Sequence, residues 1–141
     1  TPDIYRSYVP LPDNPLKYLN CYVLVSNGET LIIDTGFNRP ECKQALFDGL
    51  DELQVDFAHT KLFLTHLHGD HIYGLPSVVL GISFDQSPDG PISLYGPPGL
   101  GEYLSTSFRV CESKIACDLN IFELCFPNQS CSRRRLDEHD R

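Results

Sequence analysis

Short apolar runs in the first third of the chain are typical of β-strands. Leu19–Ser26 is rich in aromatic and β-branched residues, and Thr30–Asp34 is mostly apolar. The dipeptide Asn27-Gly28 lies between the two runs, and it is the strongest short signal for a tight hairpin. The pattern therefore predicts an antiparallel hairpin whose second strand is buried on both faces.

The pattern then changes to the helical period and back to strands. Pro40–Leu53 carries apolar residues at helical spacing, with Pro40 suited to the first turn. Lys61–Thr65 is a short strand, which we expect to lie parallel to Thr30–Asp34 because the helix provides the crossover. Beyond it we predict helices at Ser77–Phe84 and Leu100–Val110, and strands at Ile92–Tyr95 and Ile121–Phe126. This order of elements indicates an α/β fold.

Composition and charge narrow the class of protein. The 141 residues suffice for one domain, and a hydrophobic share of 41% fits a folded chain. A formal net charge of −8 excludes a protein that binds nucleic acid over its whole surface, although it allows a local basic patch. The first residues have no signal-peptide pattern, and no apolar run approaches the roughly 20 residues of a membrane span. We therefore expect a cytoplasmic protein without a membrane partner.

The six cysteines stand at positions 21, 42, 111, 117, 125 and 131, and none forms a C-x-x-C pair. Their spacings match no zinc-finger or redox pattern. Cys21 lies in an apolar strand and Cys42 in the first predicted helix, so buried free thiols are favoured over disulfides. For the four later cysteines both states stay open.

Three of the five histidines fall within six positions, directly after the third predicted strand. This segment, residues 66–71, is called the metal loop below, and it contains His66, His68, Asp70 and His71. Imidazole nitrogen and carboxylate oxygen are preferred ligands of zinc and similar ions. A histidine-rich surface loop is the weaker alternative.

The spacing of these ligands predicts how they meet. Alternate residues of an extended chain project the same way, so His66, His68 and Asp70 can face one point, with Gly69 giving the backbone freedom for a tight loop. His71 joins them only if the backbone bends after Asp70. Four ligands exceed the open shell of one catalytic metal, so we predict two Zn²⁺ ions per complete site.

The metal loop resembles the T-H-x-H-x-D-H signature of the metallo-β-lactamase superfamily, here Thr65-His66-Leu67-His68-Gly69-Asp70-His71. The resemblance implies an αββα sandwich in which His66 and His68 hold one Zn²⁺ and Asp70 and His71 hold the second. The run Leu31-Ile32-Ile33-Asp34-Thr35-Gly36 resembles the superfamily's L-I-D-T-G turn. By this resemblance Asp34 supports the metal site from nearby, with capping of the turn as an equally weighted alternative.

Two further runs narrow the resemblance to ribonuclease Z, the tRNA 3′-end endonuclease. The segment 68–76 is similar to its H-G-D-H-x-x-G-L-P run, and 95–100 is similar to its Y-G-P-x-G-L segment. This resemblance implies a zinc-dependent endoribonuclease that acts on precursor tRNA, with Asp70 as its catalytic general base. The first 60 residues instead resemble general metallo-β-lactamase-fold hydrolases, so hydrolysis of a thioester, lactone or lactam is the alternative activity.

The resemblance covers only the N-terminal half of the complete fold. We expect a partial metallo-β-lactamase-like domain at 1–129 and an exposed polar tail at 130–141. Only His139 follows the metal loop, and we expect neither His139 nor the isolated His59 to bind metal. Each metal then has about two protein ligands, where catalytic zinc usually has three.

This shortage of ligands predicts weak metal binding and low activity of the isolated chain. A half-fold also exposes an apolar sheet face, so we expect a homodimer or a complementing subunit as partner. A non-catalytic metal-binding fragment is the remaining alternative.

Overall fold

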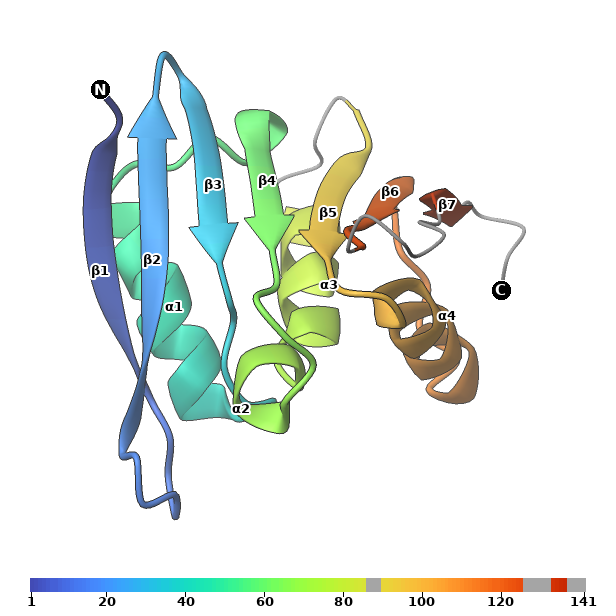
Figure 1. Cartoon of the computed structure of the whole chain (residues 1–141), viewed down its shortest axis with the longest axis horizontal. Helices are drawn as coiled ribbons and strands as arrows, with labels where there is room; N and C mark the ends of the chain where they lie inside the picture. Colours follow the sequence, from blue (N-terminus) through green and yellow to red (C-terminus); the bar gives the residue numbers. More distant parts are fainter. Residues whose placement is uncertain (86–89, 126–132, 137–141) are drawn as a thin grey trace.

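A seven-stranded mixed sheet is the main feature of the computed structural model, which describes residues 1–85, 90–125 and 133–136 (Figure 1). The strands follow one another across the sheet in chain order. They are β1 (Asp3–Pro10), β2 (Tyr18–Ser26), β3 (Glu29–Ile33), β4 (Thr60–Phe63), β5 (Ile92–Gly96), β6 (Leu119–Glu123) and β7 (Arg133–Leu136). The helices are α1 (Pro40–Glu52), the 3-10 turn η1 (Phe57–His59), α2 (Gly69–Ile72), α3 (Leu75–Asp85) and α4 (Leu100–Val110). No helix in these ranges is long and apolar enough to cross a membrane.

The predicted hairpin is confirmed as β2 and β3, which pair antiparallel. Asn27 and Gly28 have φ values of 52° and 79°, the positive values that a tight hairpin turn needs at both central residues. Strand β1, which pairs antiparallel with β2, was not predicted. Its residues are mostly exposed and only Val9 is buried, so the sequence has no apolar alternation there.

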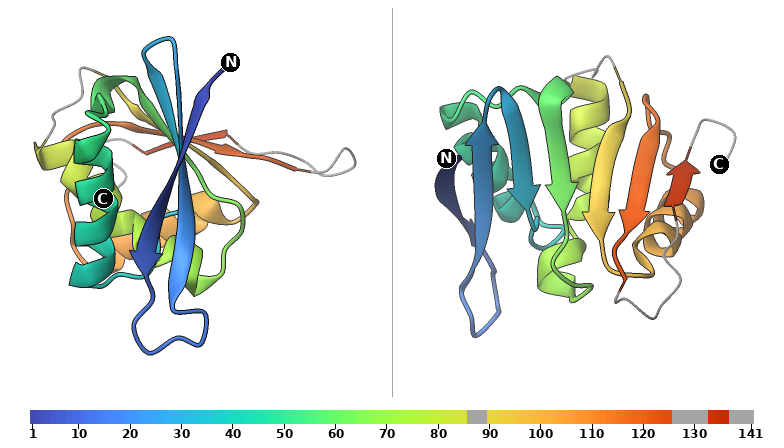
Figure 2. Two further views of the ribbon diagram at one scale, coloured as in Figure 1. Left: turned by 90° about the vertical axis from the view of Figure 1, so that its left-hand side faces the viewer. Right: turned by 45° about the horizontal axis from the view of Figure 1, so that its top comes forward.

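From β3 to β6 the strands are parallel, as the sequence predicts for β3 and β4. Helices α1, α3 and α4 all lie on the same side of the sheet (Figure 2). The carboxyl ends of parallel strands meet at one edge of a sheet, where ligands of α/β proteins gather. Asp34 follows β3 and the metal loop follows β4, so the fold brings both to this edge (Figure 1).

The core lies between the sheet and the three long helices. Alternate residues of the central strands point into it, including Cys21, Val23, Ile32, Leu62, Leu94 and Ile121, and all of them are buried. The helices contribute Leu46, Val79 and Leu104, which are fully buried. Because strand residues alternate between faces, this core uses only one side of the sheet.

The opposite side carries no helix among the described residues, and we call it the open sheet face. In-register neighbours form a row across it, namely Tyr22, Ile33, Phe63, Tyr95 and Phe122. The rings of Tyr95 and Phe122 stack with centroids 4.8 Å apart, and Arg133 lies over Phe122. The prediction that Thr30–Asp34 is buried on both faces is therefore wrong, because Leu31 and Ile33 are only half-buried.

One sheet with one layer of helices is half of the predicted αββα sandwich, so the α/β class and the partial fold are both confirmed. Within the expected tail, Arg133–Leu136 forms β7 at the sheet edge and pairs antiparallel with β6. Its three arginines are exposed and only Leu136 is buried, which explains why no apolar pattern marks it. His139 lies outside the described residues.

Candidate metal centre

The metal loop begins in extended conformation after β4 and turns into a helix at Gly69. His68 has extended φ and ψ values of −75° and 149°, and helix α2 follows with Asp70 and His71 in its single turn. The backbone N–H of His71 donates to the His68 carbonyl at 3.0 Å. The bend therefore comes after His68, two residues earlier than we predicted, because the helix starts within the motif.

This bend brings three imidazole rings together. The ring centroids of His66 and His71 are 3.9 Å apart, and those of His66 and His68 are 4.7 Å apart. The side chains of His71 and Asp70 are 16% and 18% exposed, and His71 Nε2 lies 3.5 Å from Asp70 Oδ2. All four residues of the predicted ligand set thus lie on one short stretch at the sheet edge.

Asp34 lies beneath this cluster as a buried carboxylate. Its φ of 64° is in the left-handed region, which aspartate adopts more readily than most residues. Oδ1 accepts from the backbone N–H of Thr65 at 2.9 Å, and Oδ2 accepts from the Thr65 hydroxyl at 2.8 Å. Oδ2 is also 2.8 Å from Nδ1 of His71. One carboxylate therefore contacts Thr65, just before the metal loop, and His71, the last residue of the loop.

The contacts of Thr65 set which ring nitrogen of His66 carries the proton. The Thr65 hydroxyl has one hydrogen, and it donates that hydrogen to Asp34, since a carboxylate can only accept. Thr65 Oγ1 then accepts from Nδ1–H of His66, 2.9 Å away. Nδ1 of His71 lies 2.8 Å from Asp34 Oδ2 but outside hydrogen-bond geometry, so this contact does not set the tautomer of the His71 ring. In the neutral His66 ring Nε2 is left unprotonated, which is the form that binds a metal ion.

One distance in the metal loop fits a bound metal ion. Two atoms bound to one tetrahedral zinc lie about 3.4 Å apart, from bond lengths of roughly 2.1 Å. The 3.5 Å between His71 Nε2 and Asp70 Oδ2 matches this spacing. Within the described ranges no three such side chains already converge on one point.

Backbone contacts hold α2 against the turn that follows β3. The hydroxyl and the backbone N–H of Thr35 both donate to the His71 carbonyl, at 2.8 and 3.1 Å. The backbone N–H of Gly74 donates to the Gly36 carbonyl at 2.7 Å, and a Cβ on Gly74 would lie 2.9 Å from that oxygen. Position 74 therefore requires glycine for close approach of two backbones.

Gly69 has a different role from the one we predicted. Its φ does not lie in the left-handed region, so backbone freedom is not what the loop uses there. A Cβ at this position would instead collide with the ring of Tyr73. Sequence reasoning also missed Thr35 and Thr65 as supports of the ligands, although Thr65 is the first letter of the recognised motif.

Other titratable residues do not belong to the candidate centre. Burial, and then the nearby charge of Asp34, raise the pKa of the Cys21 thiol to about 12, so Cys21 remains a neutral thiol below the sheet edge. Its thiol donates to the Asp34 carbonyl at 3.3 Å. His59 lies on η1, where its Nδ1 is 2.8 Å from Asp56 Oδ2 and its side chain is 60% exposed. This position agrees with the predicted surface role.

The sequence is similar to that of several proteins named ribonuclease Z. Ribonuclease Z of Limosilactobacillus fermentum is 38% identical over 107 residues, which are 65% of this chain and 34% of that protein. Ribonuclease Z of Enterococcus faecalis is 44% identical over 68 residues, 48% of this chain and 21% of that protein. The predicted resemblance is confirmed, and the chain spans about a third or less of the length of these curated relatives.

Solved structures agree on the fold. The short form of human tRNase Z superposes with a TM-score of 0.67 and 25% identity, covering 89% of this chain and 46% of that one. A beta-lactamase domain protein from Burkholderia ambifaria superposes with a TM-score of 0.56 and 17% identity, covering 73% of this chain and 32% of that one. The second likeness concerns the fold alone.

A family match covers most of the chain and was not anticipated from the motifs. Residues 14–130 match the family described as Anti-Pycsar protein Apyc1, and this range includes the metal loop and Asp34. Together with the metallo-β-lactamase fold of the structural neighbours, this match shows that the chain belongs to the Anti-Pycsar protein Apyc1 family.

Proposed function

We propose that this chain is the metal-binding part of a zinc-dependent hydrolase that cleaves phosphodiesters, of ribonuclease Z type, with precursor tRNA as its substrate. The observation that carries the proposal is the set of imidazoles and carboxylates at the sheet edge, with Asp34 2.8 Å from His71 Nδ1. The relatives named ribonuclease Z support the substrate class. The family description adds a biological role, anti-Pycsar, which we extend to this chain as part of the same proposal.

In this proposal His66 and His68 hold one Zn²⁺, and Asp70 and His71 hold the other. Bound zinc would supply electrostatic stabilisation of the phosphoryl oxygens and a lowered pKa of water. Asp34 fixes the ring orientation of His71 directly and that of His66 through Thr65. Asp70 accepts the proton of the attacking water as general base. Its side chain, 18% exposed, is accessible to solvent at the mouth of the site.

Each metal has about two ligands from this chain, whereas catalytic zinc usually has three protein ligands and one open position. We therefore propose that the further ligands come from residues outside the described ranges, from a second copy or from a complementing subunit. The chain alone should bind zinc weakly and turn over slowly.

Substrate choice tests the proposal. The zinc-loaded chain is assayed on bis(p-nitrophenyl) phosphate, on a precursor tRNA with a 3′ extension, and on a thioester and a lactam. We expect cleavage of the two phosphodiesters only. Activity confined to the thioester or lactam would replace the nuclease proposal with the general hydrolase.

Metal content tests the ligand set independently of activity. Mass spectrometry of the zinc-loaded chain is compared with that of Asp70→Ala and of His59→Ala, a matched control whose histidine is remote from the loop. We expect Asp70→Ala to lose bound zinc and His59→Ala to retain it. Stoichiometric zinc without turnover of any ester would favour a non-catalytic fragment.

A further inference from the structure

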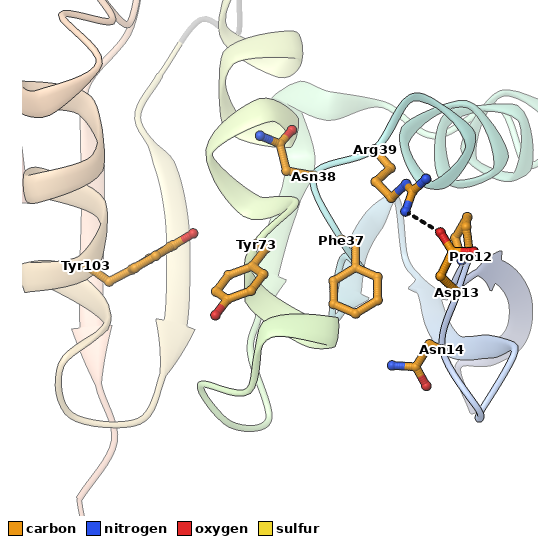
Figure 3. A pocket seen from close by; sticks show the side chains of 8 residues that line it. All are labelled: Pro12, Asp13, Asn14, Phe37, Asn38, Arg39, Tyr73 and Tyr103. Atoms are coloured by element: carbon orange, nitrogen blue, oxygen red, sulfur yellow. Dashed lines mark hydrogen bonds and ion pairs between the residues drawn. The ribbon is translucent and has the colours of Figure 1, made fainter.

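A pocket of about 480 Å³ opens beside the metal loop (Figure 3). Three aromatic rings line it, together with Pro12, a carboxylate and three other polar side chains: Phe37, Tyr73 and Tyr103, then Asp13, Asn14, Asn38 and Arg39. We call it the aromatic pocket. Its volume lies in the range of pockets that hold small ligands.

The aromatic pocket shares a wall with the metal loop. Tyr73 comes two residues after His71, and its ring packs on the Cα of Gly69, between His68 and Asp70. The Tyr103 hydroxyl donates to the Ile72 carbonyl at 3.3 Å, which ties α4 to α2. A ligand in this pocket therefore lies next to α2, the helix that carries Asp70 and His71.

The rings are arranged for contact with a flat group. The centroids of Phe37 and Tyr73 are 6.3 Å apart with an interplanar angle of 33°, so the two faces together form one broad, slightly folded wall. Tyr73 is 54% exposed, so its ring is accessible to a ligand from the pocket. Figure 3 shows Tyr103, which belongs to α4, on the side of Tyr73 that faces away from Phe37.

The polar side chains present hydrogen-bond donors. The carboxamide oxygen of Asn14 accepts from the Leu16 backbone N–H at 2.9 Å, and that of Asn38 accepts from the Ser77 hydroxyl at 2.7 Å. With the oxygens engaged, the amide NH₂ groups are what these residues offer, and Figure 3 shows the Asn14 nitrogen directed toward Phe37. Arg39 is held at one side by Asp13, 3.1 Å away, which partly balances its charge.

From this combination we infer that the aromatic pocket binds a nucleobase, that of the nucleotide next to the scissile phosphodiester. The inference rests on the proposed function for the identity of the neighbouring phosphate. Aromatic faces stack with bases of any sequence, and carboxamide and guanidinium donors pair with the oxygen and nitrogen acceptors on a base edge.

Other ligand classes use the pocket less completely. An apolar acyl group would cover the rings but would make no use of the two carboxamide donors or of Arg39, whose guanidinium already pairs with Asp13. A phosphate or sugar alone would use Arg39 and the amides but would leave three rings uncovered. A base uses both kinds of group.

The test measures binding of nucleosides to the metal-free chain, so that no turnover is needed. Adenosine, guanosine, cytidine and uridine are titrated and followed by ¹H–¹⁵N NMR, with ribose 5-phosphate as the probe that lacks a base. We expect at least one nucleoside to bind with a millimolar Kd and to shift the amide signals of Phe37 and Tyr73. Tyr73→Ala should weaken binding about tenfold, the loss typical of one base–aromatic stack, while Tyr73→Phe should bind normally.

Matched variants separate recognition from folding. Asn14→Asp keeps the acceptor for the Leu16 N–H but removes the donor, and it should weaken nucleoside binding several-fold. Phe84→Ala removes another exposed ring, 57% exposed on α3 and away from the pocket, and it should bind like the unmodified chain. Equal binding of ribose 5-phosphate, or nucleoside binding that Tyr73→Ala leaves unchanged, would overturn the inference.

The outcomes also distinguish this inference from the proposed function. Cleavage of bis(p-nitrophenyl) phosphate without any nucleoside binding would contradict the aromatic pocket alone. Nucleoside binding without cleavage of any phosphodiester would contradict the hydrolase alone and would leave the pocket as a nucleoside-binding site.

Discussion

At the scale of single residues, the buried carboxylate of Asp34 connects the parts of the candidate centre. It contacts Thr65 through two atoms and lies beside His71, while Thr65 contacts His66. The two histidines thus share one support, although neither lies next to Asp34 in the sequence. A change at Asp34 should therefore affect both predicted metals.

The substitution Asp34→Asn tests this support. Asparagine tolerates the left-handed backbone at position 34, so the fold should be kept, but the neutral amide removes the negative charge beside the Thr65 hydroxyl and the His71 ring. We expect zinc affinity to fall about 10- to 100-fold, as for loss of a carboxylate behind a metal-binding histidine. Competition with a chromophoric chelator measures the affinity.

A second variant controls for backbone strain. Asp34→Ala removes the same carboxylate and also places alanine at a φ of 64°, so it should be destabilised by roughly 1–2 kcal/mol more than Asp34→Asn. Urea unfolding measures the difference. Zinc affinity of Asp34→Asn equal to that of the unmodified chain would mean that the turn-capping role of Asp34 is its only one.

The exposed pair of His59 and Asp56 gives a prediction about pH. The hydrogen bond to Asp56, and then its charge, raise the pKa of His59 above 6.5, and His59 lowers the pKa of Asp56 below 3.8. The contribution of His59 is complete below pH 6.5 and is lost as pH rises through the raised pKa. That of Asp56 is complete above pH 3.8 and is lost as pH falls through the lowered pKa. The pair therefore stabilises the fold most between these two values.

NMR titration of the His59 ring checks the direction. In Asp56→Asn the pKa of His59 should return toward 6.5, and the asparagine can still accept from the Ala58 N–H, which preserves the start of η1. Both side chains are about 60% exposed, so added salt should shrink the pKa shift in the unmodified chain. A His59 pKa that does not respond to the substitution would refute the pairing.

At the scale of elements, α2 depends on glycine at its carboxyl end. A Cβ on Gly74 would lie 2.9 Å from the Gly36 carbonyl oxygen and 3.0 Å from that of Phe37, and backbone atoms cannot yield as a flexible side chain can. Gly74→Ala should therefore push α2 away from the turn, destabilise the fold by about 1–3 kcal/mol, and weaken zinc binding through His71. Urea unfolding and zinc titration report the two effects.

The control for this variant is Gly90→Ala. A Cβ at Gly90 meets nothing within 4 Å and its φ is not left-handed, so stability should change by less than about 0.5 kcal/mol. If Gly74→Ala unfolds at the same urea concentration as Gly90→Ala, the two backbones do not need their close approach.

The sequence predicted the elements whose apolar pattern faces a covered surface. Helix α4 was placed at Leu100–Val110 and is observed there, because Leu100, Leu104 and Phe108 face the core. Strands β1 and β7 escaped prediction, because they lie at the two edges of the sheet and bury few residues. These strands form because their backbones pair with a neighbouring strand. Backbone pairing does not require apolar residues, so it produces no pattern in the sequence.

The sequence predicted that the four metal-loop residues lie together, but it did not predict the backbone path between them, and their role as metal ligands stays a prediction. The four metal-loop residues are close in sequence, so their proximity in space follows from chain geometry. Alternation suggested an extended loop through Asp70, yet α2 begins at Gly69 because the turn at Thr35 and Gly36 accepts and supplies its hydrogen bonds. That partner is more than 30 residues away, and the roles of the two threonines depend on the same distant contacts.

At the scale of the whole molecule, the sheet has one covered face and one open face (Figure 2). The row from Tyr22 to Phe122 on the open sheet face is apolar and aromatic across five strands. The human tRNase Z chain is more than twice as long as the part that this chain matches. In the proposed function the metals take further ligands from outside the described layer, and the open sheet face adjoins the same edge.

The apolar open sheet face predicts self-association in a purified sample, because only a second copy of the chain is present there to bury it. Sedimentation velocity should show a weight-average coefficient that rises with concentration. The double substitution Phe63→Thr and Tyr95→Thr removes both rings from the row. Threonine is β-branched and suits a strand, so the double variant should fold and stay monomeric at the same concentrations. Val110→Thr, at a 72% exposed position on α4, should associate like the unmodified chain. Association that persists in the double variant but is lost in Val110→Thr would assign the contact to the helical face instead.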